Sequence, residues 1–158
     1  MWISWVVPIC ICALFALVEG LLSGPHPVQF LRSLNQPQWV MPMPAWIAIG
    51  ASFYAISAFV LHRLFQQNNA ELPIALTILM LVGNALWNFL FFRLRRLDLA
   101  FAYLVPYSAL IIALMVTAWL VDRASAVAIG LYVLFLPYDF AWVMMLWRMN
   151  GRHGAHSC

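Results

Sequence analysis

Two amides and an indole share one face of a predicted helix, because Asn84, Trp87 and Asn88 are spaced i, i+3 and i+4. Such groups hydrogen-bond neighbouring helices in a membrane, and they equally suit a ligand that needs a few oriented donors in an apolar cleft. A carboxylic acid, Asp139, lies near the middle of a long apolar stretch, where a charge is costly and usually faces a partner or a cavity. These residues are the first candidates for a binding site.

Five apolar stretches must position these side chains: Trp2–Leu22, Pro44–Phe65, Leu72–Phe92, Leu99–Val121 and Ala124–Trp147. A bilayer's hydrocarbon core needs roughly 20 apolar residues of helix, which each stretch approximately supplies. The chain of 158 residues is 66% hydrophobic and 8% charged, with a mean hydropathy of +0.92. It is predicted to be an all-α, multi-pass integral membrane protein, with a single five-helix domain over 1–150 and a short tail over 151–158. Pro106 and Pro137 fall inside the last two stretches and can kink their helices.

The third and fifth spans run in the same direction, so Asn84 and Asp139 are expected at matching depth. They can then hydrogen-bond each other directly. The alternative is that Asp139 handles a ligand or a proton. Glu19 lies close to the end of the first span, where water or an arginine is expected to reach it.

The segment 23–43 between the first two spans is long and holds four of the nine prolines. It is expected to be either a lid or a connector in the headgroup region, with one or two helical turns at Val28–Leu34. Trp39 and Trp46 flank the point where it enters the second span. With Trp87 and the two polar groups in the same half of the bundle, the pattern predicts an aromatic-walled pocket.

The arginines predict the orientation of the chain. Only Arg63 and Arg123 fall on the side of the N-terminus, and the other six fall on the opposite side: Arg32, Arg93, Arg95, Arg96, Arg148 and Arg152. The N-terminus is therefore expected outside and the C-terminus in the cytoplasm.

Several classes of function are not favoured. A formal charge of +3 without a basic stripe argues against nucleic-acid binding. Cys10 and Cys12 face different ways and Cys158 is terminal, so no disulfide framework is expected. The four histidines are dispersed and predict no metal site. No spacing typical of a nucleophilic triad, a P-loop or a dinucleotide turn is found, so an enzyme is not favoured and no cofactor is required.

Three motifs follow one another in order: Leu34–Trp39 with Pro42 and Phe53-Tyr54; Asn84–Trp87 with Phe91-Phe92 and Arg96; and Trp147–Asn150. Their order and spacing resemble those of the TspO/MBR family, the tryptophan-rich sensory proteins related to the mitochondrial translocator protein. The resemblance covers essentially the whole chain. It implies a five-helix bundle that binds porphyrins, sterols or synthetic aromatic ligands beneath the first loop, and that can form a homodimer.

By position, the resemblance assigns ligand contacts to Trp39, Tyr54, Asn84 and Trp87, and it aligns Tyr132 with a tyrosine of the family's fifth span. The chain also departs from the family pattern. Gln36 replaces a basic residue, Met41 replaces a proline, and Gly50 stands where an ungapped count places a tryptophan. Trp46, one turn earlier, is a conjectured substitute for that tryptophan, and Asp139 is not a recognised family feature.

The leading hypothesis is a receptor or carrier for a flat amphipathic ligand, a tetrapyrrole such as a porphyrin or haem-type molecule, or a sterol. The proposed ligand-binding residues are Trp39, Trp46, Tyr54, Asn84, Trp87, Asn88, Tyr132 and Asp139, with Arg32 and Arg148 pairing with propionates at the rim. The alternatives are a small proton-coupled transporter that uses Asp139, an intramembrane enzyme acting on a porphyrin, and a structural subunit of a membrane complex. The expected partners are the lipid bilayer and the small molecule.

Overall fold

The computed structural model describes residues 3–151 and contains five helical spans long and apolar enough to cross a membrane. They are α1 (Ile3–Ser23), α3 (Met43–Leu64), α4 (Glu71–Asn88) continued by the π-helical turn η1 (Phe89–Arg93), α5 (Leu97–Val121), and α6 (Arg123–Val133) followed by α7 (Leu136–Asn150). In the hydrocarbon core of a bilayer, a single spanning segment can satisfy all of its backbone hydrogen bonds within itself only as a helix. The all-α, five-span prediction is confirmed. Trp2, Arg152, Cys158 and the rest of the tail from 152 lie outside the described residues.

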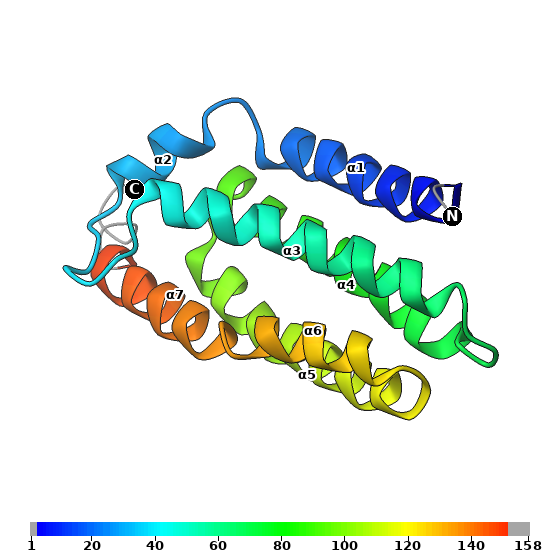
Figure 1. Cartoon of the computed structure of the whole chain (residues 1–158). Coiled ribbons are helices and arrows are strands. Elements are labelled where there is room, and N and C mark those ends of the chain that lie inside the picture. Colours follow the sequence, from blue (N-terminus) through cyan, green and yellow to red (C-terminus); the bar gives the residue numbers. More distant parts are fainter. Residues whose placement is uncertain (1–2, 152–158) are drawn as a thin grey trace.

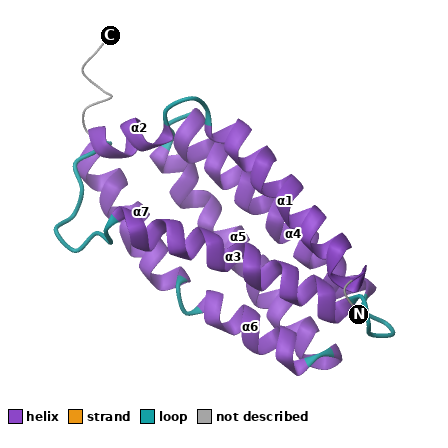
Figure 2. Ribbon diagram, turned by 45° about the horizontal axis from the view of Figure 1, so that its top comes forward, coloured by secondary structure: helices purple, strands orange, loops and turns teal. Residues whose placement is uncertain are grey.

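The helices form a closed bundle (Figures 1 and 2). α1 packs on α3 and α4, α4 packs on α5, α5 packs on α6 and α7, and α3 completes the ring by packing on α6. A short helix, α2 (Pro27–Ser33), follows α1 and contacts η1. Its place confirms the helical turns expected in the first connection, with a proline at the first helical position, where no backbone N–H is needed.

The fifth span is broken, whereas the sequence predicted one helix over Ala124–Trp147. Pro137 has no N–H to donate to the carbonyl of Val133, four residues earlier, and its ring crowds that carbonyl. The amide of Phe135 instead donates to the Tyr132 carbonyl at 3.0 Å, and α7 begins after this tight turn. α5 continues through Pro106 without interruption. The break leaves side chains on both of its sides facing α3.

A buried carboxylate fixes the bundle at the end where α6 begins. Asp122 links α5 to α6, and its two oxygens accept hydrogen bonds from Arg63 of α3 at 2.6 and 3.2 Å. The same carboxylate caps α6 by accepting from the backbone and hydroxyl of Ser125. The Arg63 guanidinium and the Ser125 donors hold the pKa of Asp122 below its usual range, at about 2. α3 is therefore tied directly to the α5–α6 corner.

Two groups of buried side chains fill the bundle, one in each half along its axis. The larger group includes Phe53, Leu81, Tyr107 and Ile129, and the smaller group surrounds Phe91, Leu104 and Trp142. α4 and α5 approach closely at Gly83, where a Cβ atom would lie 2.8 Å from two ring carbons of Tyr107. A cavity lies where the two groups meet.

Candidate functional site

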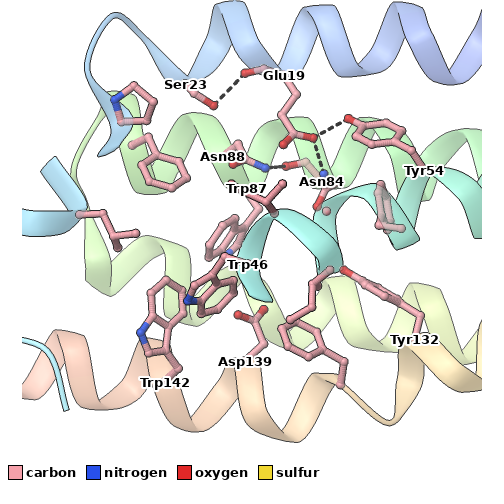
Figure 3. Close-up of a pocket in the computed structure, with 18 of the residues that line it drawn as sticks. Glu19, Ser23, Trp46, Tyr54, Asn84, Trp87, Asn88, Tyr132, Asp139 and Trp142 are labelled. Atoms are coloured by element: carbon pink, nitrogen blue, oxygen red, sulfur yellow. Dashed lines mark hydrogen bonds between the residues drawn. The ribbon is translucent and has the colours of Figure 1, made fainter. Parts of the chain in front are cut away.

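A cavity of about 340 Å³ is lined by residues of α1, α2, α3, α4, η1, α5 and the broken fifth span. This volume is within the range of small-molecule sites, which is roughly 300–1,000 Å³. Most of the wall is apolar. The side chains with carboxyl, amide or hydroxyl groups that line it are Glu19, Ser23, Tyr54, Asn84, Asn88, Tyr107, Tyr132 and Asp139. Figure 3 shows Glu19 and Asp139 reaching the cavity from opposite sides of the bundle.

Glu19 organises the polar side of the cavity next to α1. One oxygen of its carboxyl group, Oε2, accepts from the Tyr54 hydroxyl and from the Asn84 side-chain amide, each at 2.5 Å. Asn88 continues the row by donating to the Asn84 carbonyl at 3.0 Å. Three helices therefore converge on one carboxyl oxygen, and this network holds the rotamers of Tyr54 and Asn84 (Figure 3).

Four aromatic rings form a continuous layer across the α2 end of the cavity. Trp87 stacks on Phe91 with ring centroids 4.9 Å apart, and Phe91 stacks on Trp142 at 5.4 Å. Trp142 then packs against Trp46 of α3 at 4.4 Å. These rings bridge the space between α3 and α7, whose ribbons lie apart near α2 (Figure 1). The indole N–H of Trp87 is buried and has no hydrogen-bond partner among the described residues.

Asp139 projects its carboxyl group into the cavity from the first turn of α7 and lies beneath Trp46 in the close-up (Figure 3). Within residues 3–151, no hydrogen bond or ion pair to this carboxyl group is formed by a protein group. The break before α7 explains the position of Asp139, because residues 134 and 135 separate the end of α6 from the start of α7. Asp139 lies four residues after Phe135 and therefore on the same side, which faces Trp46 of α3.

The connection that covers the cavity is attached to α7 at three points. The Asn35 backbone exchanges two hydrogen bonds with the side chain of Asn150, at 2.9 and 3.1 Å. The Trp142 indole donates to the Gln36 amide at 3.4 Å, and the backbone N–H of Met41 donates to the Tyr138 hydroxyl at 2.9 Å. This segment is therefore ordered along α7 rather than loose, and α2 lies over the cavity between its attachment and α1.

Comparison with known proteins decides the family. The model of the TspO/MBR family matches residues 7–150 of the chain. The chain belongs to the TspO/MBR family. A curated relative, the protein CrtK of Rhodobacter capsulatus, is 30% identical over 128 residues, which cover 78% of this chain and 80% of CrtK. The resemblance found in the motifs is thereby confirmed over almost all of the chain, as is its placement in a membrane.

Seven of the predicted site residues line this same cavity of the TspO/MBR protein: Trp46, Tyr54, Asn84, Trp87, Asn88, Tyr132 and Asp139. Three others do not. Trp39 is 47% exposed and packs edge-on against Tyr138, outside the cavity. Arg32 and Arg148 are exposed and do not line the cavity. Gly50 lines it, with no atom within 4 Å of an added Cβ.

The hydrogen bond expected between Asn84 and Asp139 is not formed. Asn84 donates to Glu19 of α1 instead, because sequence position fixes the depth of a residue along a helix but not the direction in which its side chain points. Glu19 pairs with Tyr54 and Asn84, and none of the arginines among the described residues reaches it. An acid inside an apolar span was the available signal for this site. Trp142 also lines the cavity but was not among the predicted site residues.

Proposed function

We propose that this TspO/MBR protein is a membrane receptor or carrier that holds a flat amphipathic ligand, such as a porphyrin or a sterol, in the cavity beneath α2. The observation that supports it most strongly is the continuous aromatic layer from Trp87 to Trp46 beside a largely apolar cavity. Tryptophan rings offer large rigid faces to a planar ligand at little cost in conformational entropy. The few polar groups at the opposite side would fix its orientation.

The family and the charge distribution support two further parts of this proposal. The end of the bundle that carries α2 and η1 also carries Arg93, Arg95, Arg96 and Arg148. By the positive-inside rule this end is cytoplasmic, so the N-terminus lies outside and the cavity lies in the cytoplasmic half. The family resemblance also supports a homodimer. The tether between the first connection and α7 would then be the gate that a ligand from the cytoplasmic leaflet passes.

Tryptophan fluorescence tests the ligand proposal. The protein is placed in lipid nanodiscs and titrated with protoporphyrin, with empty nanodiscs as the blank. We expect saturable quenching, weakened about tenfold in Trp87→Ala through loss of the stacking face. Trp119→Ala is the matched control, because Trp119 is 53% exposed on α5 and does not line the cavity. Quenching that does not saturate, or that weakens equally in both variants, refutes the proposal and leaves a structural subunit as the better reading.

Asp139 supports a second candidate, a proton-coupled transporter, because its carboxyl group faces the cavity without a protein partner. In proteoliposomes loaded with protoporphyrin, Asp139→Asn would abolish proton-driven movement of the ligand while saturable quenching persists. Normal transport by that variant removes this candidate. If the unsubstituted protein moves no ligand in this assay, the transporter is excluded and the receptor remains as the proposed function.

A further inference from the structure

The charged groups that line the cavity are all acids. Glu19 and Asp139 are its two charged lining residues, and none of the arginines or histidines in the described part of the chain contributes to the wall. The arginines expected to pair with anionic groups, Arg32 and Arg148, are exposed outside it. An anionic ligand group drawn into the cavity would therefore meet two carboxyl groups and no counter-charge.

The unused hydrogen-bonding capacity of the cavity is mainly that of acceptors. Glu19 accepts both of its hydrogen bonds on Oε2, and its other oxygen makes none with the described residues. The Asp139 carboxyl group accepts none from them at all. The Asn84 and Asn88 side-chain amides each donate one of their two N–H groups within the wall. The indole N–H of Trp87 is a further donor without a partner among the described residues. A ligand that brings its own N–H groups would satisfy this wall better than one that brings oxygens.

Asp139, Trp46 and Trp142 line the same cavity. Asp139 lies below Trp46 in the view of Figure 3, and Trp142, which packs against Trp46, lies three residues further along α7 on the same helix face. A cation on a flat ring is stabilised by a carboxylate in a medium of low dielectric constant and by the negative faces of neighbouring indoles. Placed here, such a group would gain both interactions at one position.

We propose that the cavity selects flat ligands that carry a protonated basic nitrogen, with Asp139 as the counter-ion and Trp46 and Trp142 as the walls for the ring. This inference rests on the proposed function and names the ligand class for the same cavity. Anionic side groups of a larger ligand, such as propionates, would be directed out of the cavity. Asp139 is then a determinant of ligand specificity that the family motifs do not contain.

Three probes of one shape and different charge test this inference: aminoacridine, which is cationic at mildly alkaline pH, neutral acridine, and anionic acridine carboxylate. Each is titrated against the protein in phosphatidylcholine nanodiscs, whose net-neutral headgroups do not concentrate any of the three, and signals from empty nanodiscs are subtracted. We expect aminoacridine to bind about tenfold to a hundredfold more tightly than acridine, the range of a hydrogen bond to a charged group. Acridine carboxylate is expected to bind most weakly.

The variants separate this inference from the proposed function. Asp139→Asn, which keeps the shape of the side chain, should abolish the difference in affinity between aminoacridine and acridine. Asp98→Asn is the control, since Asp98 pairs with Arg96 at the same end of the bundle but outside the cavity; it should keep the preference. Equal binding of the two probes, or a preference unchanged in Asp139→Asn, overturns the inference while acridine binding still supports the receptor. Binding of none of the three refutes both.

Discussion

Gly83 sets the distance between α4 and α5, and replacing it with alanine tests that contact. A Cβ atom at this position would lie 2.8 Å from Cδ2 and Cε2 of Tyr107 and 3.0 Å from the hydroxyl of Tyr103. Tyr107 is 4% exposed, and its hydroxyl donates to the Met80 carbonyl at 3.3 Å. The ring is therefore held on both sides and has little freedom to withdraw.

Two opposing effects decide the result of Gly83→Ala. Alanine is better than glycine inside a helix by about 0.5–1 kcal/mol. Inserting a methyl group into a packed contact costs about 1–3 kcal/mol, and a separation of 2.8 Å from two ring atoms belongs in the upper part of that range. We therefore expect a net loss of about 1–2 kcal/mol in the free energy of unfolding. Because Tyr107 also lines the cavity, displacement of its ring should weaken ligand binding as well.

Reversible unfolding in mixed micelles measures this loss, and a second substitution identifies its source. Valine at position 107 ends at Cγ, short of both ring atoms that the new methyl group would meet. In the Tyr107→Val background, the penalty of Gly83→Ala should therefore be much smaller, because only the contact with the Tyr103 hydroxyl remains. If Gly83→Ala is as stable as the unsubstituted protein, or if its penalty is the same in both backgrounds, the contact with Tyr107 does not set the distance between α4 and α5.

Three further perturbations have defined outcomes. Asp122→Asn should destabilise the protein by about 1–2 kcal/mol near neutral pH, because it breaks the ion pair with Arg63. The pKa of Asp122 in the folded protein, about 2, lies below the ordinary 3.8, so the stability difference between the two proteins should shrink as the pH falls from 4 toward 2. Thermal unfolding measures this difference, and a difference that stays constant with pH would contradict the ion pair. Pro137→Ala restores a backbone donor and should slow amide hydrogen exchange at the break in the fifth span; unchanged exchange would mean that proline does not cause it. Asn150→Ala removes the Asn35 tether and should speed proteolysis of segment 34–42 severalfold; unaltered cleavage would exclude that anchor.

Most of the fold was predictable because a bilayer imposes strict rules on sequence. Apolar runs of the right length give the spans, and the i, i+3 and i+4 spacing correctly placed Asn84, Trp87 and Asn88 on one face of α4, where all three line the cavity. The link at Asp122 is so short that the last two spans must be neighbours, and α5 packs on α6. These features depend on local periodicity and chain length, which a sequence contains directly.

The contacts that the sequence did not predict depend on how each helix is rotated about its axis, because this rotation decides which neighbour a side chain faces. Depth alone paired Asn84 with Asp139, whereas the rotation of α4 directs Asn84 to Glu19 on α1. Trp39 was expected in the wall, but the tether of its segment to α7 carries it outside. The complete break at Pro137 was also missed, since proline in a membrane helix is compatible with either a mild kink or a full stop.

A ligand should occupy the cavity between the aromatic layer and the two acids. An experimental structure of the protein with bound aminoacridine decides whether it does. We expect ligand density against the faces of Trp46 and Trp142, with the ligand nitrogen within hydrogen-bonding distance of the Asp139 carboxyl group. Ligand density confined to the lipid-facing surface, with the cavity closed by its own side chains, would contradict it.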